Sequence, residues 1–330
     1  MRRALLLAAT LCGGASALRT VAAPAEAPRR QRDRLEKERR PRRRKDLAFM
    51  HVPYNFGHTV EMAALLPFMP PNMQGGFHGG SSSKFVTMNI SRSLVAMMKL
   101  LRPDAVVWGH FEPELNVVSE ATGCPMYYTP PKYWPKDLAK KYFGNKTVFG
   151  MLRDPYERLT AFFRGGFSGY GGDYPEFWKT CDVNGAVKMM LKDAIANKDP
   201  FHASCTFLPQ AEYFDGEHGI SLPIDNRRFP SMANEALQEH GYNFHIRTES
   251  IAHVRGCDNS WAGDLDAETK SLVKKVYKRD FELLCKHFNY CDDDELTCLP
   301  EVPYMCPLNH FKWDSKAKIF RKMENQTVKS

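Results

Sequence analysis

Long apolar runs are scarce in this chain of 330 residues. The one clear run, from Ala4 to Leu11, is short for a membrane span, which takes about 20 apolar residues. No internal repeat is found, and no C-x-x-C pair occurs. The irregular spacing of Cys285, Cys291 and Cys298 around His287 is therefore a weak zinc-binding pattern.

Two features that phosphate-loop enzymes need are also missing. The chain has no G-x-x-x-x-G-K-[ST] motif, and no acidic residue is clearly placed to hold magnesium. Both absences argue against a kinase. A disulfide-rich structural protein is a further alternative, but the alternation of strands and helices described below is poor evidence for it.

The net charge of +8 is concentrated at the N-terminus. Residues 1–45 contain 14 Lys/Arg and 4 Asp/Glu, a balance of +10, so residues 46–330 sit near −2. The folded part is not a polycation, and nucleic acid is not an expected partner, because binding to phosphate backbones needs a positive surface on the folded domain.

The N-terminus has the pattern of a secretory leader. Arg2 and Arg3 precede the apolar run, and Ala15-Ser16-Ala17 offers a cleavage site. We predict a signal peptide or signal anchor over residues 1–18 and a basic, disordered stem over 19–45. A bipartite organelle-targeting leader is the alternative, since the stem is rich in Arg. A possible N-terminal membrane anchor follows from the uncleaved form.

Cysteine usage agrees with export. Nine Cys occur, and eight remain after Cys12 of the leader is set aside. An even number in an exported chain suggests disulfides, with at least one bridge among the last four Cys. Three N-glycosylation acceptors, Asn89, Asn145 and Asn325, are compatible with the lumen of the secretory pathway.

The folded domain is predicted over residues 46–330. Residues 47–52 form an apolar run typical of a buried strand, and residues 59–66 are predicted to be helical, with Thr59 as cap and Glu61 in the first turn. Loop amides and a helix N-terminus then face one spot, which suits an anion.

The same alternation continues along the chain. Further strands are predicted over 105–108 and 147–152, and further helices over 91–101, 136–142, 156–163, 183–197, 232–240 and 267–288. We therefore predict an α/β fold, a P-loop-like three-layer α/β/α arrangement with a central parallel sheet and a more helical C-terminal half. Ligands bind beyond the carboxyl ends of such strands, so residues 53–59, 109–111 and 153–161 should converge.

Several motifs resemble those of the carbohydrate sulfotransferases, in particular the group that includes the heparan sulfate 2-O-sulfotransferases. His51-Val-Pro-Tyr-Asn-Phe-Gly-His-Thr59 resembles the family's H-[IV]-P-K-T-G-G-T-S, and Phe149-Gly-Met-Leu-Arg-Asp-Pro-Tyr-Glu-Arg158 resembles F-x-x-x-R-[DH]-P-x-x-R. Gly109-His-Phe111 lies between them. Residues 207–210, 247–251 and 277–281 resemble downstream landmarks, in the right order.

The resemblance implies a donor, 3′-phosphoadenosine 5′-phosphosulfate, and a glycan hydroxyl as acceptor in the Golgi lumen, without a metal. The implied donor contacts are the loop residues and two positions of the second motif: Tyr54, Asn55, Phe56, Gly57, His58, Thr59, Arg153 and Ala161. Sulfuryl transfer is an in-line displacement, so positioning and charge stabilisation contribute most. His110, at the end of a predicted strand, is the candidate general base.

Two departures from the family pattern are serious, and two further substitutions change the first loop. Tyr54 stands where the family has the Lys that assists the leaving group, and Ala161, next to Thr160, stands where it has a Ser for the 3′-phosphate. Phe56 replaces a Gly, and His58 replaces a Thr. His58 is therefore a second catalytic candidate, as a cation for the leaving group.

Other readings of these residues stay open. Lys84, after the Gly/Ser loop of residues 75–83, could serve the leaving group in place of His58. Alternatively, the chain is a catalytically degenerate protein that binds glycan or nucleotide without turnover. The Arg153-Asp154-Pro155 segment is also consistent with a structural turn, and Arg158 with a structural salt bridge.

Overall fold

A computed structural model describes residues 45–68, 92–102, 105–165, 174–197, 199–251, 256–291, 299, 301, 306–307 and 309–323. The chain divides into two units, Met1–Arg43 and Arg44–Ser330, and only the second contains described residues. The predicted leader, the stem up to residue 44, Lys84 with its Gly/Ser loop, Asn89, Asn325 and Cys298 lie outside the described residues.

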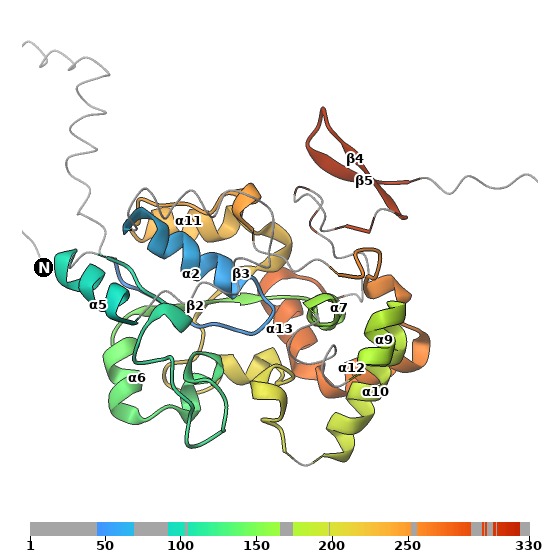
Figure 1. The fold of residues 1–330 in the computed structure, drawn as a ribbon, viewed down its shortest axis with the longest axis horizontal. Helices are drawn as coiled ribbons and strands as arrows, with labels where there is room; N and C mark the ends of the chain where they lie inside the picture. The colour runs from blue at the N-terminus through green and yellow to red at the C-terminus, as the bar shows by residue number, and fades with distance from the viewer. Residues whose placement is uncertain are drawn as a thin grey trace, which may run out of the picture. The chain divides into compact units, whose positions relative to one another are not determined.

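A parallel sheet of three strands lies at the centre of the second unit (Figure 1). Its order is β1 (Leu47–Phe49), β2 (Thr147–Leu152) and β3 (Leu222–Asp225), with both pairs parallel. The mixed α/β class and the central parallel sheet are thus confirmed. β2 has the predicted bounds, because its continuous apolar run is typical of a strand buried on both faces.

The sheet also corrects two sequence-based expectations. Residues 105–108 form no strand, although Trp108 is buried against Phe49 and Phe149. Their apolar character comes from core packing and not from strand pairing. β3 was missed because Pro223 interrupts a short run, and proline is tolerated at this position because β3 is an edge strand.

Helices cover both faces of the sheet, as Figure 1 shows for α2 and α11 on one side and α6 on the other. The α-helices are α2 (Gly57–Leu65), α5 (Arg92–Leu101), α6 (Lys136–Tyr142), α7 (Pro155–Gly165), α9 (Pro175–Thr180), α10 (Val183–Ala196), α11 (Ser231–Glu239), α12 (Ala267–Val276) and α13 (Lys278–Phe288). β4 (Phe311–Asp314) and β5 (Ile319–Lys322) form an antiparallel hairpin.

Short 3-10 helices connect many of these elements. They are η1 (Leu66–Phe68), η3 (Gly109–Phe111), η4 (Met126–Tyr128), η5 (Pro131–Tyr133), η6 (Ala203–Cys205), η7 (Gln210–Phe214), η8 (Asn226–Arg228), η9 (Thr248–Ser250) and η10 (Ala262–Asp264).

Two predicted helices differ from the observed ones. The first begins at Gly57, with Phe56 at its N-cap in the left-handed region, so Thr59 lies inside the first turn and is not the cap. The helix predicted over 267–288 is broken at Tyr277, which has a non-helical backbone. The Tyr277 hydroxyl donates to the carbonyl of Phe207 at 2.9 Å, so a tertiary contact accompanies the break.

Three disulfides join described residues: Cys124–Cys205, Cys181–Cys257 and Cys285–Cys291. The predicted bridge among the last four Cys is confirmed. Because Cys285 and Cys291 are bonded to each other, they are not thiolate ligands for zinc. The disulfides fit an oxidising compartment such as the secretory pathway or the extracellular space.

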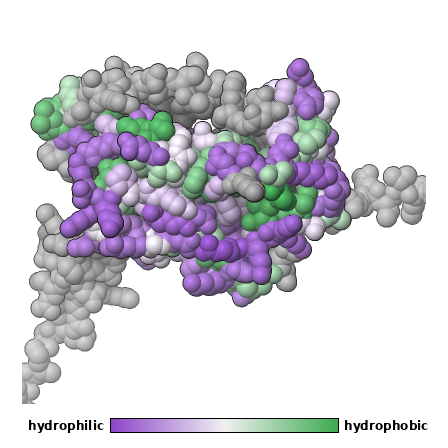
Figure 2. All heavy atoms as spheres, turned by 90° about the horizontal axis from the view of Figure 1, so that it is seen from below, coloured by the Kyte–Doolittle hydropathy of each residue, from purple (hydrophilic) through white to green (hydrophobic). Residues whose placement is uncertain are grey.

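The described surface is mostly polar. Figure 2 shows hydrophilic residues over much of one face, with hydrophobic residues gathered in separate patches. Among the described helices, none has both the length and the apolar character needed to span a bilayer.

Candidate functional site

The carboxylate of Glu61 is the centre of a buried polar cluster beside the end of β1. The Glu61 side chain is fully buried on α2. Its Oε1 accepts from His51 Nδ1 at 2.6 Å and from the His110 amide at 3.1 Å. Its Oε2 lies 3.1 Å from both His58 Nδ1 and His110 Nδ1. We name His51, His58, Glu61 and His110 the histidine cluster.

Two glycines make room for this cluster. A Cβ on Gly57 would lie 2.1 Å from Nε2 of His51, and a Cβ on Gly109 would lie 1.5 Å from Oε1 of Glu61. Gly109 also has a φ of +55°, a conformation that glycine adopts without steric cost. The Gly-His-aromatic segment is therefore needed both for its histidine and for the close approach of its glycine.

The charges of the cluster follow from its donors. Burial alone would raise the pKa of Glu61, but the surrounding histidines, which donate hydrogen bonds, hold it well below its ordinary value. Burial lowers the pKa of His51, so this imidazole is neutral. An ionised carboxylate only accepts hydrogen bonds, so each of the three Nδ1 atoms carries a proton and donates it to Glu61.

This tautomer leaves Nε2 of each neutral imidazole as an acceptor. In His58 that atom lies 3.1 Å from the hydroxyl of Tyr128 on η4. In His110 no hydrogen bond to Nε2 is found within the described part of the chain, and the side chain is 29% exposed. His110 therefore offers an open, partly exposed base, which is what general-base catalysis requires.

His51, His58 and Glu61 have the residue types of a metal site, with ligand atoms within 4.8 Å of one another. The His51 Nδ1 to Glu61 Oε1 distance is 2.6 Å. Two ligands of one tetrahedral zinc ion would lie about 3.3 Å apart, given bonds of about 2.0 Å. The spacing fits a direct hydrogen bond, and we interpret the group as hydrogen-bonded.

The first loop is filled by its two aromatic side chains. Tyr54 and Phe56 both have left-handed backbones, with φ of 64° and 59°. The Tyr54 ring packs on Phe162 at a centroid distance of 4.4 Å, and the Phe56 ring stacks on Phe229 at 5.0 Å. Tyr54 is partly buried and Phe56 is buried, so the loop is packed with apolar contacts.

Arg153 lies against this loop and is buried. Its Nη1 donates to the carbonyl of Tyr54 at 2.8 Å, and its guanidinium lies over the Phe56 ring at 5.1 Å. Its Nη2 contacts Glu157 at 3.4 Å, and Glu157 also pairs with Arg164 at 3.2 Å. Burial lowers the pKa of Arg153 to about 10, against the opposing effect of Glu157.

Arg158 has a structural position, but it is not part of a salt bridge with Asp154. Its three donor groups bond to backbone carbonyls at 2.7–3.1 Å, namely those of Pro53, Leu208 and Thr206. Arg158 thereby ties the first loop to the segment before η7. Asp154 instead accepts the amide of Glu157 at 3.1 Å.

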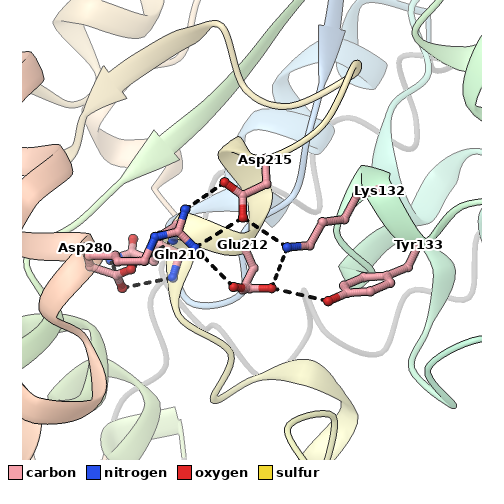
Figure 3. Close-up of polar contacts among 8 residues, drawn as sticks. Lys132, Tyr133, Gln210, Glu212, Asp215 and Asp280 are labelled. Atoms are coloured by element: carbon pink, nitrogen blue, oxygen red, sulfur yellow. Dashed lines mark hydrogen bonds and ion pairs between the residues drawn. The ribbon is translucent and has the colours of Figure 1, made fainter.

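Gln210 and Asp280, which belong to the downstream motifs, connect the segments that follow β1 and β2. Gln210 accepts from Asn55 Nδ2 at 2.5 Å and donates to the carbonyl of Arg153 at 2.7 Å. Asp280 accepts the amides of Gln210 and Ala211 at 2.9 Å each (Figure 3). Asn55 also donates to the carbonyl of Met151 at 3.0 Å. Asn55, one of the residues implied to contact the donor, therefore uses its side-chain amide for hydrogen bonds within the protein.

The remaining predicted residues lie nearby on helices. Thr59 is buried in the first turn of α2, and Ala161 is half-buried on α7. The Thr160 hydroxyl donates to the carbonyl of Tyr156 within the same helix, at 3.0 Å. The three post-strand segments do converge, since His58 and His110 share Glu61 and Arg153 contacts Tyr54.

Sequence reasoning missed the roles of Glu61 and Tyr128. Glu61 was expected in the first turn of the helix, but the helix begins at Gly57, so Glu61 lies beyond the first turn and among residues that are mostly buried. An acidic residue among so many apolar ones is the signal that could have indicated a buried partner. Tyr128 gave no signal, because its contact with His58 spans 70 residues.

The chain matches no protein-family model, no curated protein and no solved structure.

Proposed function

We propose that this protein is a sulfotransferase of the secretory pathway that transfers a sulfuryl group from 3′-phosphoadenosine 5′-phosphosulfate to a glycan hydroxyl. The observation that carries the proposal is the open Nε2 of His110, with its Nδ1 held by the ionised Glu61. The His110 ring lies beside the β1–α2 loop, whose position in a P-loop-like α/β/α domain suits an anionic donor.

In this proposal His110 is the general base. Its Nε2 accepts the proton of the acceptor hydroxyl as the oxygen–sulfur bond forms and the bridging sulfur–oxygen bond breaks. The resulting imidazolium is stabilised by Glu61 at 3.1 Å. Glu61 also fixes the ring and its tautomer, so it is a positioning residue.

Donor binding would fall to the first loop, residues 54–59, and to Arg153. The Arg153 guanidinium lies against this loop, with its Nη1 on the Tyr54 carbonyl. A bound phosphate would replace the Arg153–Glu157 contact, which is long for a charge-assisted hydrogen bond at 3.4 Å. Golgi residence and a possible N-terminal anchor belong to the same proposal.

Calorimetry with 3′-phosphoadenosine 5′-phosphate tests the donor site on the purified full chain. We expect micromolar binding that is lost in Arg153→Ala. Turnover of the complete donor with a mixed glycan acceptor tests the base, and we expect a loss of at least about 100-fold in His110→Asn. His245→Asn, which changes an exposed histidine far along the sequence, is the matched control. Absence of nucleotide binding would refute the proposal.

A catalytically degenerate binding protein is the second candidate. It is favoured by the packing of Tyr54 and Phe56 within the loop, and by the neutralisation of Arg153 by Glu157. This candidate predicts nucleotide or glycan binding without turnover. The two functions are separated by the same assay, since only the enzyme loses activity in His110→Asn.

A further inference from the structure

His58 and His110 compete for one carboxylate oxygen. Both Nδ1 atoms lie 3.1 Å from Oε2 of Glu61, and the two rings meet edge to face at a centroid distance of 5.2 Å. One negative charge stabilises one imidazolium well, and a second proton beside it would be repelled. The cluster can therefore support a base at His110 only if His58 stays neutral.

The two histidines differ in their second nitrogen. The Nε2 of His58 lies 3.1 Å from the hydroxyl of Tyr128, whereas that of His110 is open within the described residues. Because Nδ1 of His58 carries the proton, the Tyr128 hydroxyl is the donor in this pair. Burial raises the pKa of Tyr128 well above its ordinary value, so the hydroxyl keeps its proton.

Tyr128 is held in place independently of His58. Its backbone carbonyl accepts from the Tyr213 hydroxyl at 2.7 Å, and its ring packs edge to face on His51 at 4.8 Å. A protonated His58 would turn Nε2–H toward this hydroxyl. The hydroxyl would then have to accept, and its own proton has no other acceptor within the described part of the chain.

The groups that face His58 come from four segments. They are Glu61 from α2, His51 from the segment after β1, His110 from η3 and Tyr128 from η4. Tyr127, also from η4, contacts His51 and His110. Tyr54 of the first loop lies close enough to Tyr128 to interact electrostatically. Among these side chains Glu61 is the charged one.

We infer that Tyr128 is a positioning residue that holds His58 in its neutral form, so that the shared oxygen of Glu61 stabilises the proton that His110 takes up. The inference rests on the proposed function, since it explains why one of two similar histidines serves as base. It also assigns His58 a neutral, hydrogen-bonded role in place of the predicted role as a cation for the leaving group.

The test is a histidine titration by nuclear magnetic resonance on the isotopically labelled full chain. In Tyr128→Phe the ring stays and the donated hydrogen bond is lost. We expect the titration midpoint of His58 to rise by about one pH unit, a tenfold change in proton affinity, and that of His110 to fall by less. Tyr127→Phe is the control, since its hydroxyl forms no hydrogen bond to a histidine of the cluster.

The double variant Tyr128→Phe with His58→Asn measures the coupling, and we expect the His110 midpoint to return to its original value. Unchanged midpoints in Tyr128→Phe would overturn the inference. Should Tyr128→Phe fail to fold, His58→Asn alone decides: an unchanged His110 midpoint supports a neutral His58, and a raised one contradicts it. These titrations need no turnover. If the protein turns over the donor but the midpoints do not shift in Tyr128→Phe, the inference is wrong and the proposed function stands. If the midpoints shift but the protein does not bind the nucleotide, the proposed function is wrong and the inference about Tyr128 stands.

Discussion

Two buried carboxylates near the carboxyl edge of the sheet have opposite proton affinities. Glu61 accepts from three imidazoles and one amide, and these donors outweigh its burial and hold its pKa well below the ordinary value. Burial raises the pKa of Asp154 to about 7, because the amides of Glu157 and Tyr156 and the charge of Arg227 at 4.0 Å do not offset it. The number of close donors, and not burial itself, decides the charge of each group.

The surroundings of the two carboxylates differ in the same way. A small pocket lies beside Asp154, with room for about one water molecule. Arg153 Nε, Glu157 Oε2 and Asn226 Oδ1, which lie on residues lining this pocket, are buried and have no hydrogen-bond partner within the described chain. No atom of the histidine cluster is left in this state. The buried polar atoms of the histidine cluster are therefore satisfied within the protein, whereas the pocket beside Arg153 has buried polar groups that a bound molecule could satisfy.

The largest expected effect comes from Gly109→Ala, which strikes the centre of the histidine cluster. The new Cβ would lie 1.5 Å from Glu61 and must displace a buried ionised carboxylate. We expect a loss of about 3–5 kcal/mol in the free energy of unfolding, measured with urea. Gly123→Ala separates the causes, because Gly123 has a φ of +71° but nothing within 4 Å of the added Cβ. It should cost only about 1–2 kcal/mol. Equal losses in both variants would show that backbone strain, and not the cluster, is responsible.

Glu61→Gln keeps the shape of the side chain and removes its charge. One of the two acceptor oxygens becomes an amide donor, so at least one imidazole loses its acceptor. We expect a loss of about 1–3 kcal/mol in stability and a loss of turnover. The sign of the pH dependence follows from the lowered pKa. Glu61 stabilises the fold above its ordinary value of 4.5, and this contribution is lost as the pH falls through its lower folded value. The variant should therefore be destabilised at pH 7 and approach the original protein in strong acid.

Asp154→Asn should act in the opposite direction. A carboxyl whose pKa rises from 3.8 to about 7 on folding contributes stability below 3.8 that is lost as the pH rises through 7. We expect the variant to be more stable than the original by about 1–3 kcal/mol at pH 8 and nearly equal to it at pH 4, in thermal unfolding at both values. Destabilisation at pH 8 would mean that the Arg227 contact is worth more than the cost of burying the charge.

The smallest effect is expected on the surface. Arg279 pairs with Asp215 at 2.7 Å and with Glu212 at 3.4 Å. Lys132 contacts the same two carboxylates (Figure 3). These exposed groups are screened by water, so Arg279→Ala should change the stability by at most about 1 kcal/mol. Neighbouring Asp280→Asn replaces the buried partner of Gln210 and should cost more. A large effect of Arg279→Ala would show that the ion pairs brace η7.

Much of the fold could be predicted from local sequence. β2 and α6 have the predicted bounds, and α7, α10 and α11 agree within two residues, because apolar periodicity and helix ends are local signals. The convergence of residues 53–59 and 153–161 also followed from the rule that parallel strands present their carboxyl ends together, whereas residues 109–111 meet them without a preceding strand.

What the sequence by itself determined, then, is the class of fold, the central parallel sheet, the presence of disulfides and the neighbourhood of His58, His110 and Arg153. The tertiary structure alone decided the pairing of β3, the break at Tyr277 and the role of Glu61. His51 and His110, which lie 10 and 49 positions from Glu61 in the sequence, both hydrogen-bond to its carboxylate, and Tyr128 contacts His58 across 70 positions. A buried charge takes its protonation state from donors that only folding assembles, and no local pattern records them.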